Sequence, residues 1–186
     1  RQRQMCIRDR FNMLRISNAP TIISNVMVGL ALAIQSHSLA WSETSMPPRL
    51  DFLKILFIIS VAILLMYFSG MIFNDAMDAK WDKKHRPNRP IPSGLIKRRD
   101  AWLTASFMMV CAVLLCGMPQ GALQLSIVLS LAILAYTFFL RWLFPAAILM
   151  ALSRSLGYFI AMTALSPPPP FGHLLGFCIA IGVYTT

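Results

Sequence analysis

Residues 74–94 read N-D-A-M-D-A-K-W-D-K-K-H-R-P-N-R-P-I-P-S-G and follow directly on a long apolar run, residues 52–73. Asn74, Asp78 and Asp82 recur every four residues, so on a helix they lie along one side. They span roughly 12 Å along the helix axis at about 1.5 Å per residue. The stretch therefore predicts an apolar helix that continues into a ladder of oxygen-bearing side chains.

The chemistry of this ladder points to a metal ion and a phosphate group. Mg²⁺ prefers oxygen ligands and usually also binds phosphate oxygens of a substrate. We interpret Asn74, Asp78 and Asp82 as metal ligands, with Asp78 and Asp82 as the catalytic carboxylates. Cations that suit phosphate oxygens follow at once: Lys80, Lys83, Lys84, Arg86 and Arg89. Ordinary charges flanking a membrane helix would explain the cations, but they explain the acids poorly.

Asp75 is the remaining acid of the stretch. On a helix of 3.6 residues per turn it lies about 100° from the start of the ladder, so we expect it to point away from the ladder face. Replacing Asp75 should therefore cost less activity than replacing Asp78.

The pattern N-x-x-x-D-x-x-x-D followed by R-P-x-R-P-I-P-S-G resembles the UbiA superfamily of intramembrane prenyltransferases. Asn74, Asp78 and Asp82 match the first Asp-rich motif of that family, and residues 86–94 match the loop after it without insertion. The resemblance implies Mg²⁺-dependent transfer of a polyprenyl group from a prenyl diphosphate to an aromatic or quinone-precursor acceptor in the membrane. It also implies a second Asp-rich motif on a later helix.

Other functions stay open at this point. Relatives with the same loop act on chlorophyllide or on glycerol-phosphate lipids, so a different acceptor is one alternative. A non-catalytic transporter or lipid-binding membrane protein is another. An acidic pair on a later helix would favour the enzyme.

Composition defines the fold class. Of the 186 residues, 57% are hydrophobic and 13% are charged, which is too apolar for a soluble domain of this size. Several runs approach the ~20 apolar residues that cross a bilayer. We predict an all-α, polytopic transmembrane helix bundle with five spans and the start of a sixth, where the resembling family usually has nine. The predicted spans cover residues 21–35, 52–73, 101–117, 122–140 and 144–165, and the sixth begins at residue 171.

The distribution of charge predicts the orientation. The net charge is +10, and eight of the 17 Lys and Arg residues lie between Lys80 and Arg99. With a cytoplasmic N-terminus and a cytoplasmic loop 74–100, the positive-inside rule is satisfied, which suggests an integral protein of a bacterial inner membrane. A basic block tethered to a membrane suits lipid head groups or phosphates, and it makes nucleic acid the weaker partner.

Three more residues are candidate substrate contacts. The resembling family often has a Tyr followed by a cation, which points to Tyr136 and Arg141. The alternatives are an interfacial aromatic for Tyr136 and a positive-inside anchor, which we favour, for Arg141. Arg154 lies well inside the fifth span, where an arginine is costly and normally faces a cavity or a partner. It would meet an acidic group of the acceptor, or an acid on a further helix.

The two ends of the chain carry separate expectations. Residues 1–10, R-Q-R-Q-M-C-I-R-D-R, resemble a translated sequencing adapter, so we expect the native domain to lie in residues 11–186. The chain stops inside the predicted sixth span, before any second acidic motif. We therefore expect a fragment of a longer gene that is inactive by itself. The scattered cysteines show no spacing for zinc or a disulfide framework.

Overall fold

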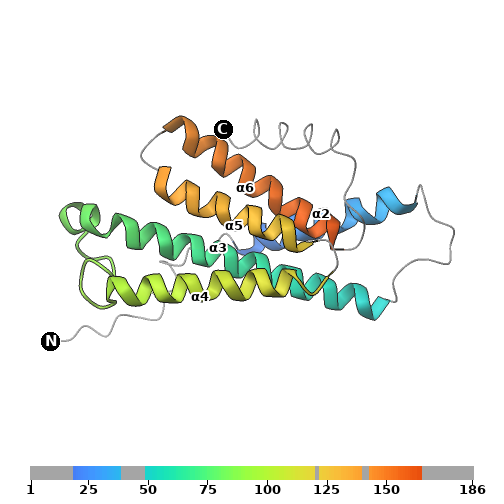
Figure 1. Ribbon diagram of the computed structural model, residues 1–186, viewed down its shortest axis with the longest axis horizontal. Coiled ribbons are helices and arrows are strands. Elements are labelled where there is room, and N and C mark those ends of the chain that lie inside the picture. Colours follow the sequence, from blue (N-terminus) through green and yellow to red (C-terminus); the bar gives the residue numbers. More distant parts are fainter. Residues whose placement is uncertain (1–18, 39–48, 120–121, 140–142, 165–186) are drawn as a thin grey trace.

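The structure is a computed structural model that describes residues 19–38, 49–119, 122–139 and 143–164, and within these ranges it is an all-α bundle. The helices in chain order are α2 (Ala19–Ser38), α3 (Arg49–His85), α4 (Arg98–Cys116), α5 (Ala122–Phe139) and α6 (Leu143–Thr163) (Figure 1). The predicted all-α bundle is confirmed, and each of the first five predicted spans corresponds to one helix. The predicted sixth span lies outside the described residues.

Helix length and composition support a membrane-spanning bundle. Among the described residues, three helices are long and apolar enough to cross a membrane: Asp51–His85, Arg98–Cys116 and Ala122–Phe139. Two shorter apolar segments, Pro20–Ile34 in α2 and Ile148–Thr163 in α6, accompany them. The prediction of five full spans is therefore confirmed for three of them.

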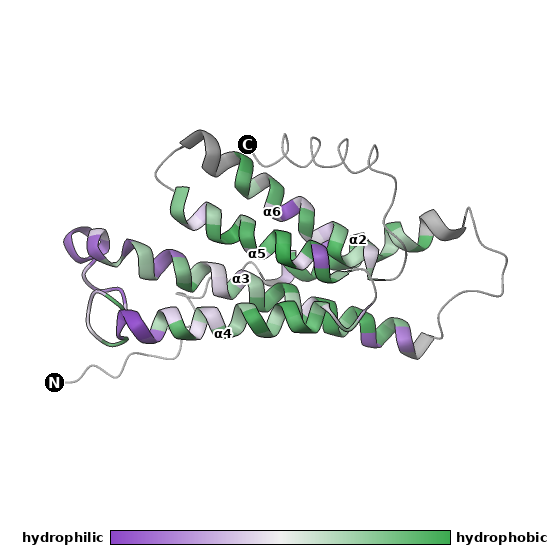
Figure 2. Ribbon diagram, in the orientation of Figure 1, coloured by the Kyte–Doolittle hydropathy of each residue, from purple (hydrophilic) through white to green (hydrophobic). Residues whose placement is uncertain are grey.

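Helix α3 is the longest element and connects the apolar body to a polar end. Its 37 residues make it about 55 Å long, well beyond the ~30 Å of a bilayer core. The predicted continuation of the apolar helix into the acidic ladder is confirmed, because α3 runs on through Asp82 to His85. Residues 74–85 include good helix formers, and the first helix breaker is Pro87. Figure 2 shows hydrophilic residues concentrated where α3 ends and α4 begins.

Helix α4 packs along α3 through small residues. Its buried face contains Ala101, Ala105, Ala112 and Cys116, which allow the two backbones to approach closely. The Ser69 hydroxyl of α3 donates a 2.7 Å hydrogen bond to the Ala105 carbonyl of α4. On the opposite side, Leu103, Phe107, Val110 and Leu114 are exposed and apolar, as expected of a lipid-facing surface.

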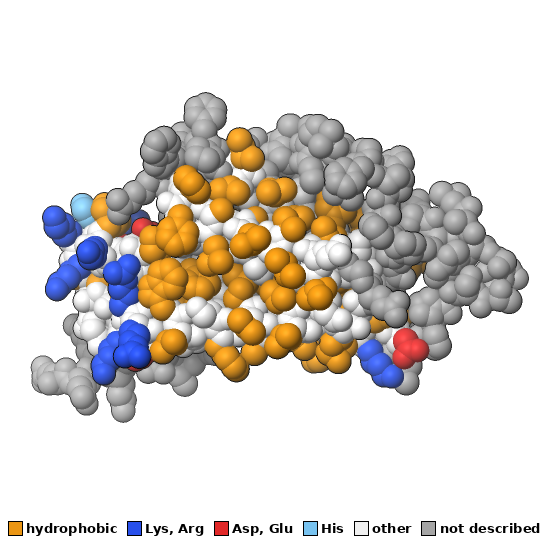
Figure 3. Space-filling view, viewed as in Figure 1, with side chains coloured by type: hydrophobic (Ala, Val, Ile, Leu, Met, Phe, Trp, Pro, Cys, Tyr) orange, Lys and Arg blue, Asp and Glu red, His pale blue; other side chains and the backbone are white. Residues whose placement is uncertain are grey.

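Helices α2, α5 and α6 form the other half of the bundle. Helix α6 packs against both α5 and α2. A Cβ atom added at Gly29 of α2 would lie 2.7 Å from the Tyr158 carbonyl oxygen of α6, so this crossing requires a residue without a side chain. Figure 3 shows apolar side chains over the middle of the molecule and Lys and Arg side chains gathered at one end.

Candidate functional site

A cavity of about 260 Å³, open on one side, is lined by residues of α2, α3, α5 and α6. Most of its wall is apolar, with contributions from Ile63, Met66, Leu129 and Ile133. The polar residues that line it are Asn25, Tyr67, Asn74, Tyr136, Ser153 and Arg154. Three residues that were predicted for separate reasons, Asn74, Tyr136 and Arg154, therefore lie around one cavity.

The polar atoms of this cavity differ in how they are satisfied. The Tyr158 hydroxyl donates a 2.8 Å hydrogen bond to Asn25 Oδ1, which joins α6 to α2 beside the cavity. Asn74 Oδ1 is buried and has no hydrogen-bond partner within the described part of the chain. Since a buried oxygen without a partner costs free energy, it is a candidate ligand contact.

A second group of site residues lies at the polar end of α3. Arg89 Nη1 lies 2.7 Å from Asp82 Oδ2 and 3.2 Å from Asp75 Oδ1, so one guanidinium nitrogen contacts two carboxylates. The Asp82 side chain is only 2% exposed, and the Arg89 side chain is 28% exposed. The half-buried Asp78 makes no side-chain hydrogen bond or ion pair with any described residue.

The expectation that Asp75 points away from the ladder is wrong, because Asp75 lies on the same side of the helix as Asp82. A four-residue spacing drifts by about 40° per step, whereas seven residues return to within about 20° of the same direction. Asp75 therefore shares a helix face with Asp82, and both reach Arg89. The seven-residue spacing of Asp75 and Asp82 predicts that they share a helix face, but attention to the four-residue ladder hid this pattern.

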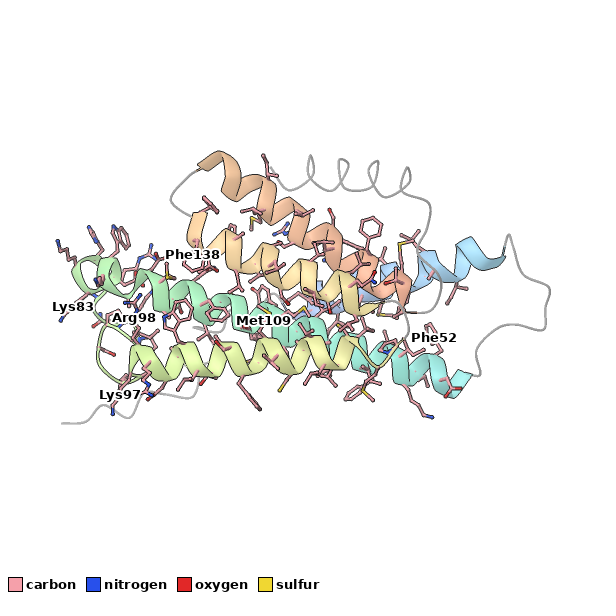
Figure 4. The ribbon with its side chains drawn as sticks, viewed as in Figure 1. Phe52, Lys83, Lys97, Arg98, Met109 and Phe138 are labelled. Carbon is pink, nitrogen blue, oxygen red and sulfur yellow. The ribbon has the colours of Figure 1, made fainter. Side chains whose placement is uncertain are left out.

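The cations of this end take different positions. Arg86 lies over the Trp81 ring, 5.9 Å from its centroid, and Trp81 stacks on His85 at 4.1 Å. The Arg98 Nε group donates a 2.8 Å hydrogen bond to the Ala76 carbonyl, which ties the start of α4 to α3. Lys83 is exposed at the end of α3, across from Lys97 and Arg98 (Figure 4). Arg141 lies outside the described residues.

The donor atoms of the predicted ligands decide whether the site can hold Mg²⁺. Within the described ranges, no group of three or more His, Cys, Asp or Glu is placed to hold a metal ion. Mg²⁺, however, is usually bound by one or two carboxylates together with waters and substrate phosphates. The all-oxygen set of Asn74, Asp78 and Asp82, with its unsatisfied amide oxygen, fits an ion shared with a phosphate. It does not fit a metal cage built only of protein ligands.

Comparison with known proteins identifies the class. A model of the UbiA prenyltransferase family matches residues 22–186. The chain belongs to this family, in agreement with the resemblance of residues 74–94.

The individual relatives fall into two groups with different names. The chain is 32% identical over 109 residues to a digeranylgeranylglyceryl phosphate synthase of Methanothrix thermoacetophila, covering 58% of this chain and 40% of the relative. It is 30% identical over 125 residues to a 4-hydroxybenzoate octaprenyltransferase of Aliivibrio salmonicida, covering 65% of this chain and 44% of the relative. The matches thus span about two fifths of the length of these curated relatives.

The fold is also similar to a solved structure. A structure reported for digeranylgeranylglyceryl phosphate synthase superposes with a TM-score of 0.73 and 14% sequence identity. The match covers 94% of this chain and 58% of that chain. At this identity the likeness supports the helical membrane fold and no finer statement.

Proposed function

We propose that the full-length protein transfers a prenyl group from a prenyl diphosphate to an acceptor that carries an anionic group, with an aromatic acid as the first choice. The observation that supports this best is the shared cavity. Asn74, from the acidic ladder, and Arg154, from α6, line it together. A donor held at the ladder and an acceptor held at Arg154 would therefore meet in one apolar space.

The donor end would be formed by the polar end of α3. Asn74, Asp78 and Asp82 would hold Mg²⁺, which when bound neutralises the negative charge on a diphosphate leaving group. Arg86, Arg89 and Lys83 extend from the same end and suit the remaining phosphate oxygens, since arginine binds phosphate through several donors. Family membership supports this arrangement, because the matched residues 22–186 include the ladder and the loop after it.

The transfer step would take place in the apolar cavity. The bond between the allylic carbon and the diphosphate oxygen breaks, and its electron pair leaves with the diphosphate. An electron-rich carbon of the acceptor attacks the allylic cation and then loses its proton. The apolar wall excludes water that would otherwise quench the cation. Tyr136 lines the same cavity, and its ring offers a face that attracts positive charge.

The acceptor end would be formed by Arg154. The compounds named in the two groups of relatives, a hydroxybenzoate and a glyceryl phosphate, both carry an anion. A cation in the wall of an apolar cavity is suited to either group. A glycerol-phosphate lipid is therefore the second candidate acceptor, supported by the relative that is 32% identical.

The orientation is part of the proposal. Exposed Lys and Arg residues gather at the end where α3 ends and α4 begins (Figure 3), which favours a cytoplasmic location for residues 80–99. Single cysteines at Asn88 and at Ser45 of the full-length protein would report the two sides. Labelling of position 88 from outside the membrane would contradict this orientation.

An activity assay tests the function itself. The full-length protein in membranes would be supplied with labelled prenyl diphosphate and Mg²⁺, and with either 4-hydroxybenzoate or a prenylated glyceryl phosphate. We expect labelled product with one acceptor, and none after Asp78→Ala. Absence of transfer with both acceptors, together with retained binding of the lipid, would favour the lipid-binding alternative.

A further inference from the structure

Within the described part of the chain, Arg89 is the counter-charge of the most deeply buried carboxylate at the polar end of α3. Asp82 is 2% exposed, and its Oδ2 atom lies 2.7 Å from Arg89 Nη1. The same nitrogen is 3.2 Å from Asp75 Oδ1, so one guanidinium nitrogen contacts both carboxylates. A buried carboxylate strongly requires a cation, because its charged form is otherwise costly to keep away from water.

Asp78 provides the contrast within the same helix. It lies between Asp75 and Asp82 in sequence but takes no part in the contact with Arg89. The acidic face is therefore divided into two carboxylates held by an internal cation and one carboxylate left for an incoming ligand. A divalent ion held by Asp78 and Asp82 would compete with Arg89 for Asp82.

The loop that carries Arg89 is held by bonds that do not involve its guanidinium. The Ser93 amide donates to the Arg89 carbonyl at 2.9 Å, and the Ile96 amide donates to the Pro90 carbonyl at 3.1 Å. The Ser93 hydroxyl also donates to the Pro90 carbonyl, at 3.1 Å. Because these bonds fix the backbone, the Arg89 side chain can change partners without unfolding of the loop.

We propose that Arg89 is an exchangeable counter-ion: it neutralises Asp75 and Asp82 while no metal is bound, and it moves to the diphosphate oxygens when a divalent cation takes Asp82. The proposal rests on the proposed function, and it assigns Arg89 two successive partners at that site. A divalent ion and a guanidinium repel each other at the same carboxylate. Metal alone should therefore bind weakly, and a diphosphate should strengthen metal binding by giving Arg89 a new partner.

The test measures metal binding instead of turnover. Mn²⁺, which is visible by electron paramagnetic resonance, would be titrated into the purified full-length protein with and without an unreactive prenyl thiolodiphosphate. Protein-free titrations would correct for complexes formed in solution. In wild type we expect the thiolodiphosphate to tighten Mn²⁺ binding about tenfold, a typical size for coupling between two ligands.

Two variants separate competition from simple loss of charge. Arg89→Gln should bind Mn²⁺ alone about tenfold more tightly than wild type and should lose most of the coupling to the thiolodiphosphate. Lys97→Gln removes the same charge from an exposed position at the same polar end, just before α4, and it should change Mn²⁺ affinity less than about twofold. Equal or weaker Mn²⁺ binding by Arg89→Gln would overturn the proposal.

If Arg89→Gln fails to fold, the Mn²⁺ titrations of the wild-type protein provide the test. Absence of coupling between Mn²⁺ and the thiolodiphosphate in wild type would overturn it. Failure of the wild-type protein to bind either probe would overturn the proposed function as well. Coupling that persists unchanged in a folded Arg89→Gln protein would overturn the role of Arg89 and leave the proposed function intact.

Discussion

The cavity wall and the polar end of α3 differ in how their polar atoms are satisfied. In the cavity wall the polar groups are few, and Asn74 Oδ1 has no partner among the described residues. At the polar end, Arg89 already contacts Asp75 and Asp82. A ligand in the cavity therefore finds space and an unsatisfied oxygen, whereas a ligand that binds Asp75 or Asp82 at the polar end must replace an existing counter-charge. Changes at the polar end should affect catalysis most, and changes in the cavity should affect the choice of acceptor and the packing.

The largest effect is expected at the carboxylates themselves. Asp78→Ala and Asp82→Ala should each lower kcat at least about 100-fold without loss of expression, because each removes a member of a unit that acts together. The matched control is Asp51→Ala, at the other end of α3, where an exposed pair with Lys54 contributes little. A protein that works equally well without Mg²⁺, or an active Asp78→Ala variant, would contradict the assignment.

Asp75→Ala tests whether the second carboxylate that contacts Arg89 contributes to catalysis. Because Asp75 shares Arg89 with Asp82, we now expect a loss of about tenfold in kcat/KM, well above the effect of Asp51→Ala. Steady-state kinetics with prenyl diphosphate as the varied substrate would measure it. If Asp75→Ala behaves like Asp51→Ala, the contact with Arg89 has no part in catalysis.

Variants of Arg154 test whether the cavity binds the acceptor. Arg154→Gln should raise the KM for an anionic acceptor about tenfold and leave the KM for prenyl diphosphate nearly unchanged, because a charged hydrogen bond to the acceptor is lost. Arg154→Lys should recover part of the affinity, since it keeps the charge but loses the planar fork. A loss of folded protein in both variants would instead indicate that Arg154 pairs with an acid on another helix.

The sequence was sufficient for the pattern along each helix and insufficient for contacts between helices. The apolar runs and the ladder of Asn74, Asp78 and Asp82 follow helical periods that can be counted in one chain. The continuation of α3 through the ladder to His85 agrees with the absence of a helix breaker between Asn74 and Pro87.

Contacts that depend on tertiary packing could not be predicted in this way. The hydrogen bond between Tyr158 and Asn25 joins residues 133 positions apart, and only the packing of α6 against α2 brings them together. The contact of Arg89 with Asp75 depends on the path of the loop after α3. The cavity exists only because four helices meet. Asn74 and Arg154 could be predicted as site residues from the sequence, but Asn25, which also lines the cavity, could not.

The smallest effect is expected at two glycines, Gly29 at the crossing of α2 and α6 and Gly157 in the cavity wall. At Gly29, an added Cβ would lie 2.7 Å from the Tyr158 carbonyl oxygen and 2.8 Å from Ala161 Cβ, so α2 and α6 would have to separate. Overpacking of this kind costs about 1–3 kcal/mol, so Gly29→Ala should lower the thermal midpoint in detergent by several degrees. At Gly157, which lines the cavity, an added Cβ meets nothing within 4 Å in the described structure. Gly157→Ala is thus the matched control and should leave the midpoint within about one degree, helped by the better helix propensity of alanine. A larger loss of stability in Gly157→Ala than in Gly29→Ala would mean that the open space lies at the α2–α6 crossing and not at the cavity.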